Sequence, residues 1–238
     1  MTKPLALVTG ASRGIGAALA VRLAAEGRHV LLAARTEGGL TETDDRVRAA
    51  GGSATLAPID LLQTPDIDRL ADATARRWPD GLDLLVLNAA MLGTLSPLAH
   101  QPPAEFERVV ALNLTAQWHL LRAFDPLLRR AGGAVVGLTS SVAVGGRAYW
   151  GAYAAAKAGF EALLGTYADE MKALRVEVLL VDPGPTRTAM RRAAYPGEDP
   201  ATVKPPEVVA ERIAERLAQG LPPGLTRLKL DRAGAVVG

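Results

Sequence analysis

The chain has 238 residues, 49% of them hydrophobic, which is enough for one domain with a sizeable core. It has no cysteine, which excludes disulfides, thiolate nucleophiles and cysteine-ligated zinc, and its three histidines are scattered, so we expect no metal site. The net charge is +2 and no basic run is interleaved with aromatic residues, so the sequence predicts no nucleic-acid partner.

No stretch approaches the roughly 18 apolar residues of a membrane span. The first apolar run, Leu5–Val8, is too short for the core of a signal peptide and is typical of a strand. We therefore expect a cytoplasmic protein that has no membrane partner.

Short apolar runs alternate with stretches of helical periodicity along the chain. Strands are predicted at Leu5–Thr9, His29–Ala34, Ala54–Ile59, Leu82–Asn88, Ala134–Thr139, Val176–Val181 and, more weakly, Thr226–Leu230. Helices are predicted at Ile15–Glu26, Thr41–Ala50, Asp66–Arg77, Ala104–Arg130, Gly151–Leu174 and Pro205–Gln219. Most of the strands lack polar alternation, as expected of strands that are buried on both faces. This order predicts an α/β fold of the Rossmann type, a doubly wound parallel sheet of about seven strands with helices on both faces.

The segment from Pro183 to Pro206 is rich in proline and shows no clear periodicity. A long irregular segment in a compact domain is usually a functional lid or a disordered loop. Elsewhere the chain has no linker and no internal repeat. We therefore expect a single dinucleotide-binding and catalytic domain over residues 1–238, with a substrate-binding loop at residues 188–206.

A glycine-rich turn follows the first predicted strand and leads directly into a helix. Glycine at such positions permits a tight turn and lets the backbone approach a pyrophosphate. The free N–H groups and positive dipole end of the helix also favour phosphate. The turn is therefore a candidate dinucleotide site, formed by Gly10, Ser12, Arg13, Gly14, Ile15 and Gly16.

The end of the second predicted strand indicates which dinucleotide binds. An NAD site usually has an acidic residue there, whereas this chain has Arg35 directly after the strand. Arg13 lies in the glycine turn and can approach the same place, and two guanidinium groups suit a 2′-phosphate. The alternative is that both are solvated surface arginines. The sequence favours NADP(H), with NAD(H) possible.

Tyr153 and Lys157 lie four residues apart in a predicted helix and so share one of its faces. A tyrosine has a pKa of about 10, and a nearby ammonium group favours the phenolate and lowers that pKa. Ser140, at the end of the fifth predicted strand, can donate a hydrogen bond to a substrate oxygen. The alternative is an ordinary amphipathic helix that happens to carry a tyrosine and a lysine.

Together these motifs resemble those of the short-chain dehydrogenase/reductase family, in its short single-domain branch. The resemblance covers about residues 3–190 and rests on Thr9 to Gly16, Asp60-Leu61, Asn88-Ala89, Asn113, Ser140, Tyr153 to Lys157 and Pro183-Gly184. It implies that Asn113, Ser140, Tyr153 and Lys157 are catalytic. It also implies that further residues bind the cofactor, namely Asp60, Leu61, Asn88, Ala89, Tyr153, Lys157, Pro183, Gly184, Thr186 and Thr188.

The resemblance also implies individual roles. Tyr153 would be the acid in carbonyl reduction and the base in alcohol oxidation, and Lys157 would lower the pKa of Tyr153 and bind the nicotinamide ribose. Asn113 would hold a water molecule, although an asparagine that kinks or caps its helix is equally compatible with the sequence. The chain departs from the family pattern at Ala90, where glycine is usual, and at its C-terminus, Leu228 to Gly238.

The sequence thus predicts an NADP(H)-dependent oxidoreductase that acts on a small-molecule carbonyl or alcohol. The alternative is a non-catalytic NADP(H)-binding sensor with the same fold, which would be expected to lack Ser140, Tyr153 or Lys157. Candidates for lining the substrate pocket are Leu92, Val142, Arg147, Tyr149, Trp150 and Tyr195. By the same resemblance, the long helices at residues 104–130 and 151–174 are expected to form a homodimer or homotetramer.

Overall fold

The computed structural model describes residues 3–237. Seven strands form one parallel sheet in the order β3-β2-β1-β4-β5-β6-β7, which confirms the predicted doubly wound architecture. The strands are β1 (Leu5–Thr9), β2 (His29–Ala34), β3 (Ser53–Pro58), β4 (Leu84–Leu87), β5 (Ala134–Leu138), β6 (Glu177–Asp182) and β7 (Leu225–Lys229).

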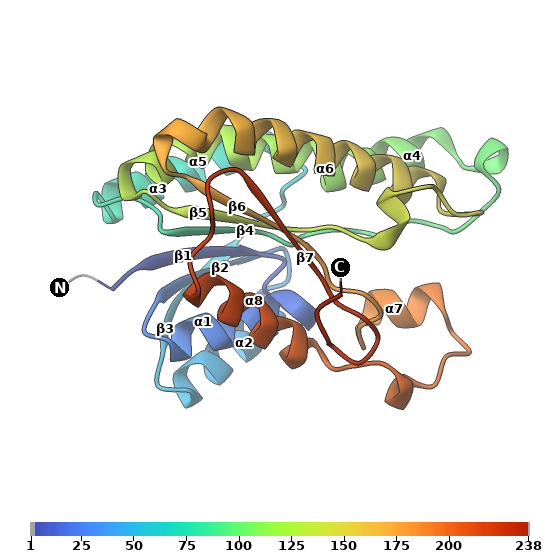
Figure 1. Cartoon of the computed structure of the whole chain (residues 1–238), viewed down its shortest axis with the longest axis horizontal. Coiled ribbons are helices and arrows are strands. Elements are labelled where there is room, and N and C mark those ends of the chain that lie inside the picture. The colour runs from blue at the N-terminus through green and yellow to red at the C-terminus, as the bar shows by residue number, and fades with distance from the viewer. Residues whose placement is uncertain (1–2, 238) are drawn as a thin grey trace.

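Helices cover both faces of this sheet (Figure 1). One face carries α3 (Thr64–Arg77), α4 (Pro103–Val110), α5 (Ala116–Ala131) and α6 (Gly151–Met171). The other face carries α1 (Gly14–Ala25), α2 (Glu37–Ala49) and α8 (Pro206–Ala218). The short helix α7 (Ala189–Ala194) lies beside the C-terminal loop, away from both layers.

Two hydrophobic clusters stabilise the sheet, one on each face, because β1, β4, β5 and β6 send apolar side chains both ways. Phe124 of α5 and Phe160 of α6 are fully buried on one face, and Leu19 and Leu23 of α1 are fully buried on the other. This two-sided burial explains why the strands have no polar alternation in the sequence.

The strand order reverses between β1 and β4, which pair in parallel from Ala6↔Leu84 to Val8↔Val86. In open parallel sheets, ligands bind beyond the carboxyl ends of the strands at such a switch point. The ends of β1, β4, β5 and β6 therefore frame the candidate site.

The structure corrects three predicted elements. The helix expected at 104–130 is divided into α4 and α5 by a π turn at Ala111–Thr115. The helix expected to start at Thr41 starts at Glu37. The segment expected to be irregular contains α7 and a 3-10 turn at Pro200–Thr202, which are too short to show periodicity in the sequence.

The weakly predicted last strand forms at Leu225–Lys229 and pairs with β6 along its whole length, despite the unusual C-terminus. After it, the chain folds back and Leu230 pairs with Val236. The Asp231 side chain holds this loop by accepting from the backbone N–H groups of Ala233, Gly234 and Ala235.

Candidate active site

Thr9, at the end of β1, connects β1 to the end of β4. Its hydroxyl donates to the Val86 carbonyl at 2.8 Å and accepts from the N–H groups of Asn88 and Ala89 at 3.0 and 3.1 Å. The Asn88 amide in turn donates to the Thr9 carbonyl at 2.8 Å. The role of Thr9 was not predicted, although a polar residue that closes an apolar strand was an available signal.

The glycine turn sits directly on this junction. Gly10 and Gly14 have φ values of 66° and 60°, a region that favours glycine. A Cβ atom at Gly10 would lie 2.8 Å from Asn88 Nδ2, and one at Gly16 would lie 2.4 Å from the Gly10 carbonyl oxygen. Both glycines are therefore needed for the packing of the turn against the end of β4. Ile15, just inside α1, packs against the core.

Arg13 and Arg35 are both exposed beside this turn. Within residues 3–237, neither guanidinium group forms an ion pair with a carboxylate. Ser12 packs closely against Gly39 at the start of α2, where a Cβ atom on the glycine would lie 2.9 Å from that of Ser12. The turn therefore carries one unpaired cation, Arg13, and the end of the neighbouring strand β2 is followed by another, Arg35.

Asp60 and Leu61 follow β3 at the next strand end. One carboxylate oxygen of Asp60 accepts from the Leu62 N–H at 3.1 Å, so this side chain caps the turn that follows β3. Leu61 is 5% exposed and belongs to the core, so only its backbone is available to a ligand.

The segment after β6 faces the glycine turn from the other side. Gly184 has a φ of 59°, and a Cβ atom there would lie 2.2 Å from the Leu230 carbonyl oxygen. A Cβ atom at Gly14 would lie 3.5 Å from the Thr188 methyl group, which places Thr188 beside the turn. Thr186 is buried and donates to the carbonyl of Gly184, and Pro183 starts the segment.

The π turn between α4 and α5 places Asn113 fully inside the protein. Its amide accepts from the Met91 N–H at 2.9 Å and donates to the Met91 carbonyl at 2.8 Å. Gln117, which sequence reasoning missed, donates to the Ala89 carbonyl at 3.1 Å. In this structure the two amides hold the loop after β4, and Asn113 acts as an anchor within a distorted helix.

The predicted trio comes together at the carboxyl end of β5. Ser140 lies two residues after the end of β5 and forms a hydrogen bond with Tyr153, which is 7% exposed. Lys157 is 3% exposed and donates to the Leu138 carbonyl at 2.6 Å. Its ammonium nitrogen lies 5.9 Å from the centroid of the Tyr153 ring. Hydroxyl, phenol and ammonium therefore meet in one place.

Burial dominates the proton affinities of this trio. It raises the pKa of Tyr153 to about 12, an effect that the Asp182 carboxylate reinforces and the Ser140 hydrogen bond opposes. Burial lowers the pKa of Lys157 to about 8, while the Glu161 carboxylate acts in the opposite direction. The sequence predicted a lowered tyrosine pKa. The structure gives a raised one, because removal of the phenol from water outweighs the favourable contacts.

Apolar and aromatic side chains surround Tyr153. Val142 belongs to the same small cluster, and Leu92, Met91, Met190 and Trp150 pack against it. The Trp150 ring centroid lies 5.8 Å from that of Tyr153 and 6.0 Å from that of Tyr195. Tyr195, which directly follows α7, also accepts a hydrogen bond from Arg147. Four of the six predicted pocket residues thus lie in or against this aromatic group, and Arg147 is bonded to it.

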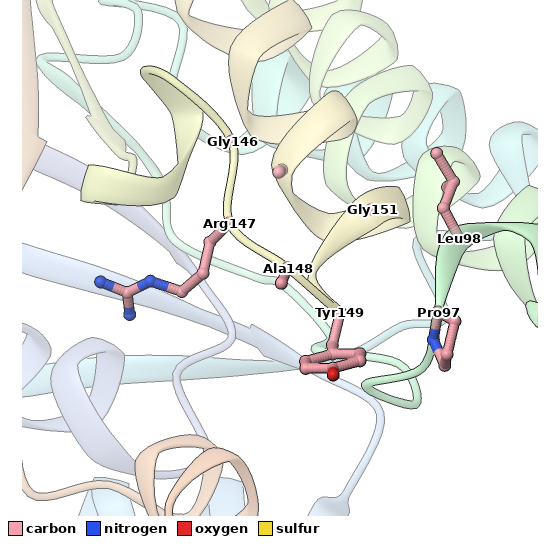
Figure 2. A pocket seen from close by; sticks show the side chains of 8 residues that line it. Pro97, Leu98, Gly146, Arg147, Ala148, Tyr149 and Gly151 are labelled. Atoms are coloured by element: carbon pink, nitrogen blue, oxygen red, sulfur yellow. The ribbon is translucent and has the colours of Figure 1, made fainter.

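Tyr149, the remaining predicted pocket residue, lies in a different pocket from the aromatic group around Tyr153. It lines a neighbouring pocket of about 500 Å³ together with Pro97 and Leu98, while the Arg147 side chain extends away from them (Figure 2). Tyr149 is 59% exposed and has a φ of 74°, which is unusual for a residue with a side chain. This pocket opens beside the N-terminus of α6, where Gly151 and Ala154 form its wall.

Residues 3–237 contain neither a metal-binding cluster nor a membrane-spanning helix. No group of three or more His, Cys, Asp or Glu side chains is placed to hold a metal ion. No helix of that range is long and apolar enough to cross a membrane.

A family model, related sequences and solved structures all match this chain and agree on one family. A model of the short chain dehydrogenase family matches residues 4–199. The uncharacterized oxidoreductase YciK of Escherichia coli strain K12 is 38% identical over 204 residues, covering 84% of this chain and 80% of that protein. The 3beta-hydroxysteroid dehydrogenase 1 of Eggerthella lenta is 34% identical over 192 residues, covering 79% and 73%. A short chain dehydrogenase of Shigella flexneri 2a strain 301, solved in complex with NADP, has a TM-score of 0.90 at 34% identity over 98% of each chain.

Proposed function

The chain belongs to the short-chain dehydrogenase/reductase family, and on that basis we propose that it is an NADP(H)-dependent oxidoreductase that interconverts a carbonyl group and an alcohol. The observation that carries the proposal is the meeting of Ser140, Tyr153 and Lys157 at the end of β5. It puts a proton donor at the strand ends that border the glycine turn, where open sheets bind their ligands.

The residues present fit a dinucleotide phosphate. A Cβ atom at Gly10 or Gly16 would collide with protein atoms around Asn88, so glycine is required for this tight turn. The N-terminus of α1, which follows the turn, would supply free N–H groups to a pyrophosphate. Thr188 closes the turn from the opposite side. The unpaired Arg13 and Arg35 would hold a 2′-phosphate. The relative from Shigella flexneri binds NADP, which supports the same choice here.

When bound, the nicotinamide supplies the hydride that adds to the carbonyl carbon. Tyr153 donates its phenolic proton to the carbonyl oxygen, and the Ser140 hydroxyl orients that oxygen by hydrogen bonding. Burial raises the pKa of Tyr153 to about 12, so at neutral pH the phenol carries the proton that carbonyl reduction requires. In the oxidation direction Tyr153 accepts a proton, and the positive charge of Lys157 stabilises the phenolate.

We expect the substrate to approach over α7. Val142, Leu92 and Trp150 give Tyr153 an apolar environment, and Tyr195 connects that environment to α7. An apolar or aromatic ketone suits such walls. The segment 188–206 is therefore proposed as the substrate-binding loop.

A screen of carbonyl compounds with NADPH and NADH tests the function. The Tyr153→Phe variant should lose about 10²- to 10⁴-fold in kcat, because the general acid is removed. NADPH binding, measured by fluorescence, should change little. Tyr167→Phe is the matched control, because Tyr167 lies on the same helix but bonds to Asp125, away from the trio.

The result also separates the proposal from the sensor alternative. A protein that binds NADPH and turns over no carbonyl or alcohol in the panel would favour the sensor. Full turnover by Tyr153→Phe would contradict the assignment of the proton donor.

A further inference from the structure

Glu161 lies one helical turn beyond Lys157 on α6 and bonds to the residue that follows β5 and to a residue of β7. Its Oε1 accepts from the Thr139 hydroxyl at 2.8 Å, and its Oε2 accepts from Arg227 of β7 at 2.8 Å. The Glu161 side chain is 14% exposed, whereas that of Arg227 is 59% exposed. The carboxylate is thus mostly inside the protein, while the cation that pairs with it lies at the surface.

These contacts make α6 hold two consecutive residues at the end of β5. Lys157 donates to the Leu138 carbonyl, and Glu161 accepts from the hydroxyl of the next residue, Thr139. The residue after that is Ser140, which bonds to Tyr153. The position of Ser140 relative to Tyr153 is therefore set by two side chains on the same helix as Tyr153.

Glu161 is also the charge that acts on Lys157. Residues four apart on a helix are neighbours, and burial of an ammonium group favours its neutral form. The Glu161 carboxylate opposes that effect of burial. The pKa of Lys157 is nevertheless lowered to about 8. The charged fraction of Lys157 at neutral pH therefore depends on the neighbouring charges that counteract the effect of burial on this pKa.

The other groups around Lys157 are either uncharged or exert their main electrostatic effect on another residue. Leu138 and Phe160 contact its ammonium group without a charge of their own, and Asn113 of the π turn that packs against α6 is neutral. Asp182 at the end of β6 acts on Tyr153, and Arg227 reaches the trio through Glu161. Glu161 is therefore the carboxylate best placed to control the charge of Lys157.

We propose that Glu161 is a positioning residue of this site, which holds Lys157 in its charged form and, through Thr139, fixes Ser140 against Tyr153. The proposal rests on the function proposed above, because it assigns Glu161 to the same trio. No substrate is needed for the first test.

The first test is a direct titration of Lys157. The chain has five lysines, so ¹³C-lysine labelling gives few NMR signals, and a Lys157→Met sample identifies the one of interest. In Glu161→Gln the Lys157 midpoint should fall by roughly one pH unit, because one opposing charge is removed. In Arg227→Gln it should stay or rise, because the Glu161 charge is no longer partly neutralised. Glu170→Gln, an exposed carboxylate on the same helix, is the matched control and should leave the midpoint unchanged.

A second test uses the pH profile of kcat/KM for carbonyl reduction. The alkaline limb should move to lower pH in Glu161→Gln and should not do so in Arg227→Gln. Thr139→Val removes the hydroxyl bond without changing charge, so it should lower kcat without moving the limb. If Glu161 merely supported the fold, the alkaline limb would not respond differently to Glu161→Gln and Arg227→Gln.

An unchanged Lys157 midpoint in Glu161→Gln would overturn the charge part of the proposal, and an unchanged kcat in Thr139→Val would overturn the positioning part. These outcomes are distinguishable from failure of the proposed function. If no carbonyl is turned over but the midpoint shifts, the function fails and the control of Lys157 by Glu161 stands.

Discussion

Lys157 is a buried lysine, and its pKa differs between the folded and the unfolded chain. Its protonation therefore makes the free energy of unfolding depend on pH. Below pH 8 it is charged in both the folded and the unfolded chain, so the folded state bears the full cost of burial. Between the folded pKa of about 8 and the ordinary value of 10.5, only the unfolded chain keeps the proton. The unfolded state then binds more protons, so the free energy of unfolding rises with pH in that window.

The Lys157→Met variant tests this link. It lacks the titration, so the free energy of unfolding of the natural protein should rise relative to the variant between pH 8 and 10, with a full effect on the order of 3 kcal/mol. Above pH 10 the raised pKa of Tyr153 acts in the opposite direction, because the unfolded phenol ionises first. Urea unfolding at several pH values measures the difference. Lys172→Met, at an exposed lysine paired with Asp169, is the control, and a pH-independent difference for Lys157→Met would contradict the argument.

We propose that Arg35 sets the preference for NADP(H) over NAD(H). In Arg35→Ala the Kd for NADPH should rise by about 10-fold or more, because a charged hydrogen bond to the 2′-phosphate is lost. The Kd for NADH should change little. Fluorescence titration with both cofactors measures the ratio, and Arg76→Ala on the exposed surface of α3 is the control. If the ratio of the Kd values for NADPH and NADH is unchanged in Arg35→Ala, the 2′-phosphate does not bind at Arg35.

Some residues of the site could not be predicted from the sequence. Tyr153 and Lys157 are four positions apart, so their shared helix face follows from periodicity. Glu161 bonds to Arg227, which lies 66 positions away, and Thr9 bonds across 79 positions to Asn88. Such pairs depend on strand order, which no local pattern in one sequence specifies.

At the scale of elements, the π turn at Ala111–Thr115 is the largest departure from the predicted pattern. The residues from Pro103 to Ala131 are helical throughout, so their periodicity looks like one long helix. The π turn is wider than an α-helical turn, and within it the side-chain amide of Asn113 points inward and bonds to Met91. Short π segments inside α-helices occur frequently at functional sites.

Asn113→Ala tests the anchoring role of this turn. The loss leaves both backbone groups of Met91 without their partner, so the free energy of unfolding should fall by about 2 to 3 kcal/mol. Urea unfolding measures the change. The exposed Gln219→Ala should stay within about 0.5 kcal/mol of the natural protein. Loss of activity at undiminished stability would instead favour the water-holding role that the family resemblance implies.

The boundaries of other elements show the same limit of local reasoning. All seven strands were predicted, most of them because they are continuous apolar runs and β7 more weakly, although β4 is shorter at both ends than expected. The helix α7 has six residues, fewer than two turns, so no periodicity could reveal it. Its place is set by contacts instead, since Thr188 accepts from the Arg191 N–H, and Arg191 pairs with Glu198 at 2.6 Å.

At the scale of the whole molecule, two layers of helices pack on one sheet (Figure 1). The candidate site lies at the carboxyl ends of four strands of this sheet. Lys204, 5% exposed, holds the C-terminal part to this edge by donating to the carbonyls of Pro185 and Asp231. The segment after β6 and the loop after β7 are thereby joined through one buried amine.

The outer surfaces of α5 and α6 are proposed to form the contact in a homodimer or homotetramer. Trp118 of α5 is 46% exposed, and the exposed side of α6 carries Ala155, Ala158 and Ala162, whose small side chains allow close packing of helices. Sedimentation should therefore give a multiple of the 24.9 kDa subunit, and Trp118→Arg should shift the mass toward one subunit. Val236→Arg, an exposed apolar residue outside these helices, should leave the mass unchanged. A natural protein that sediments as one subunit would contradict the proposal.

The sequence by itself determined the class of fold, the glycine turn and the shared helix face of Tyr153 and Lys157, because buried strands, glycine turns and helix faces are local patterns. The tertiary structure alone decided what surrounds that pair. It brought Asp182 and Ser140 to Tyr153 from two different strands, and Glu161 to Thr139 and Arg227. Burial and charge act through space, so the proton affinities of Tyr153 and Lys157 depend on neighbours that are remote in sequence.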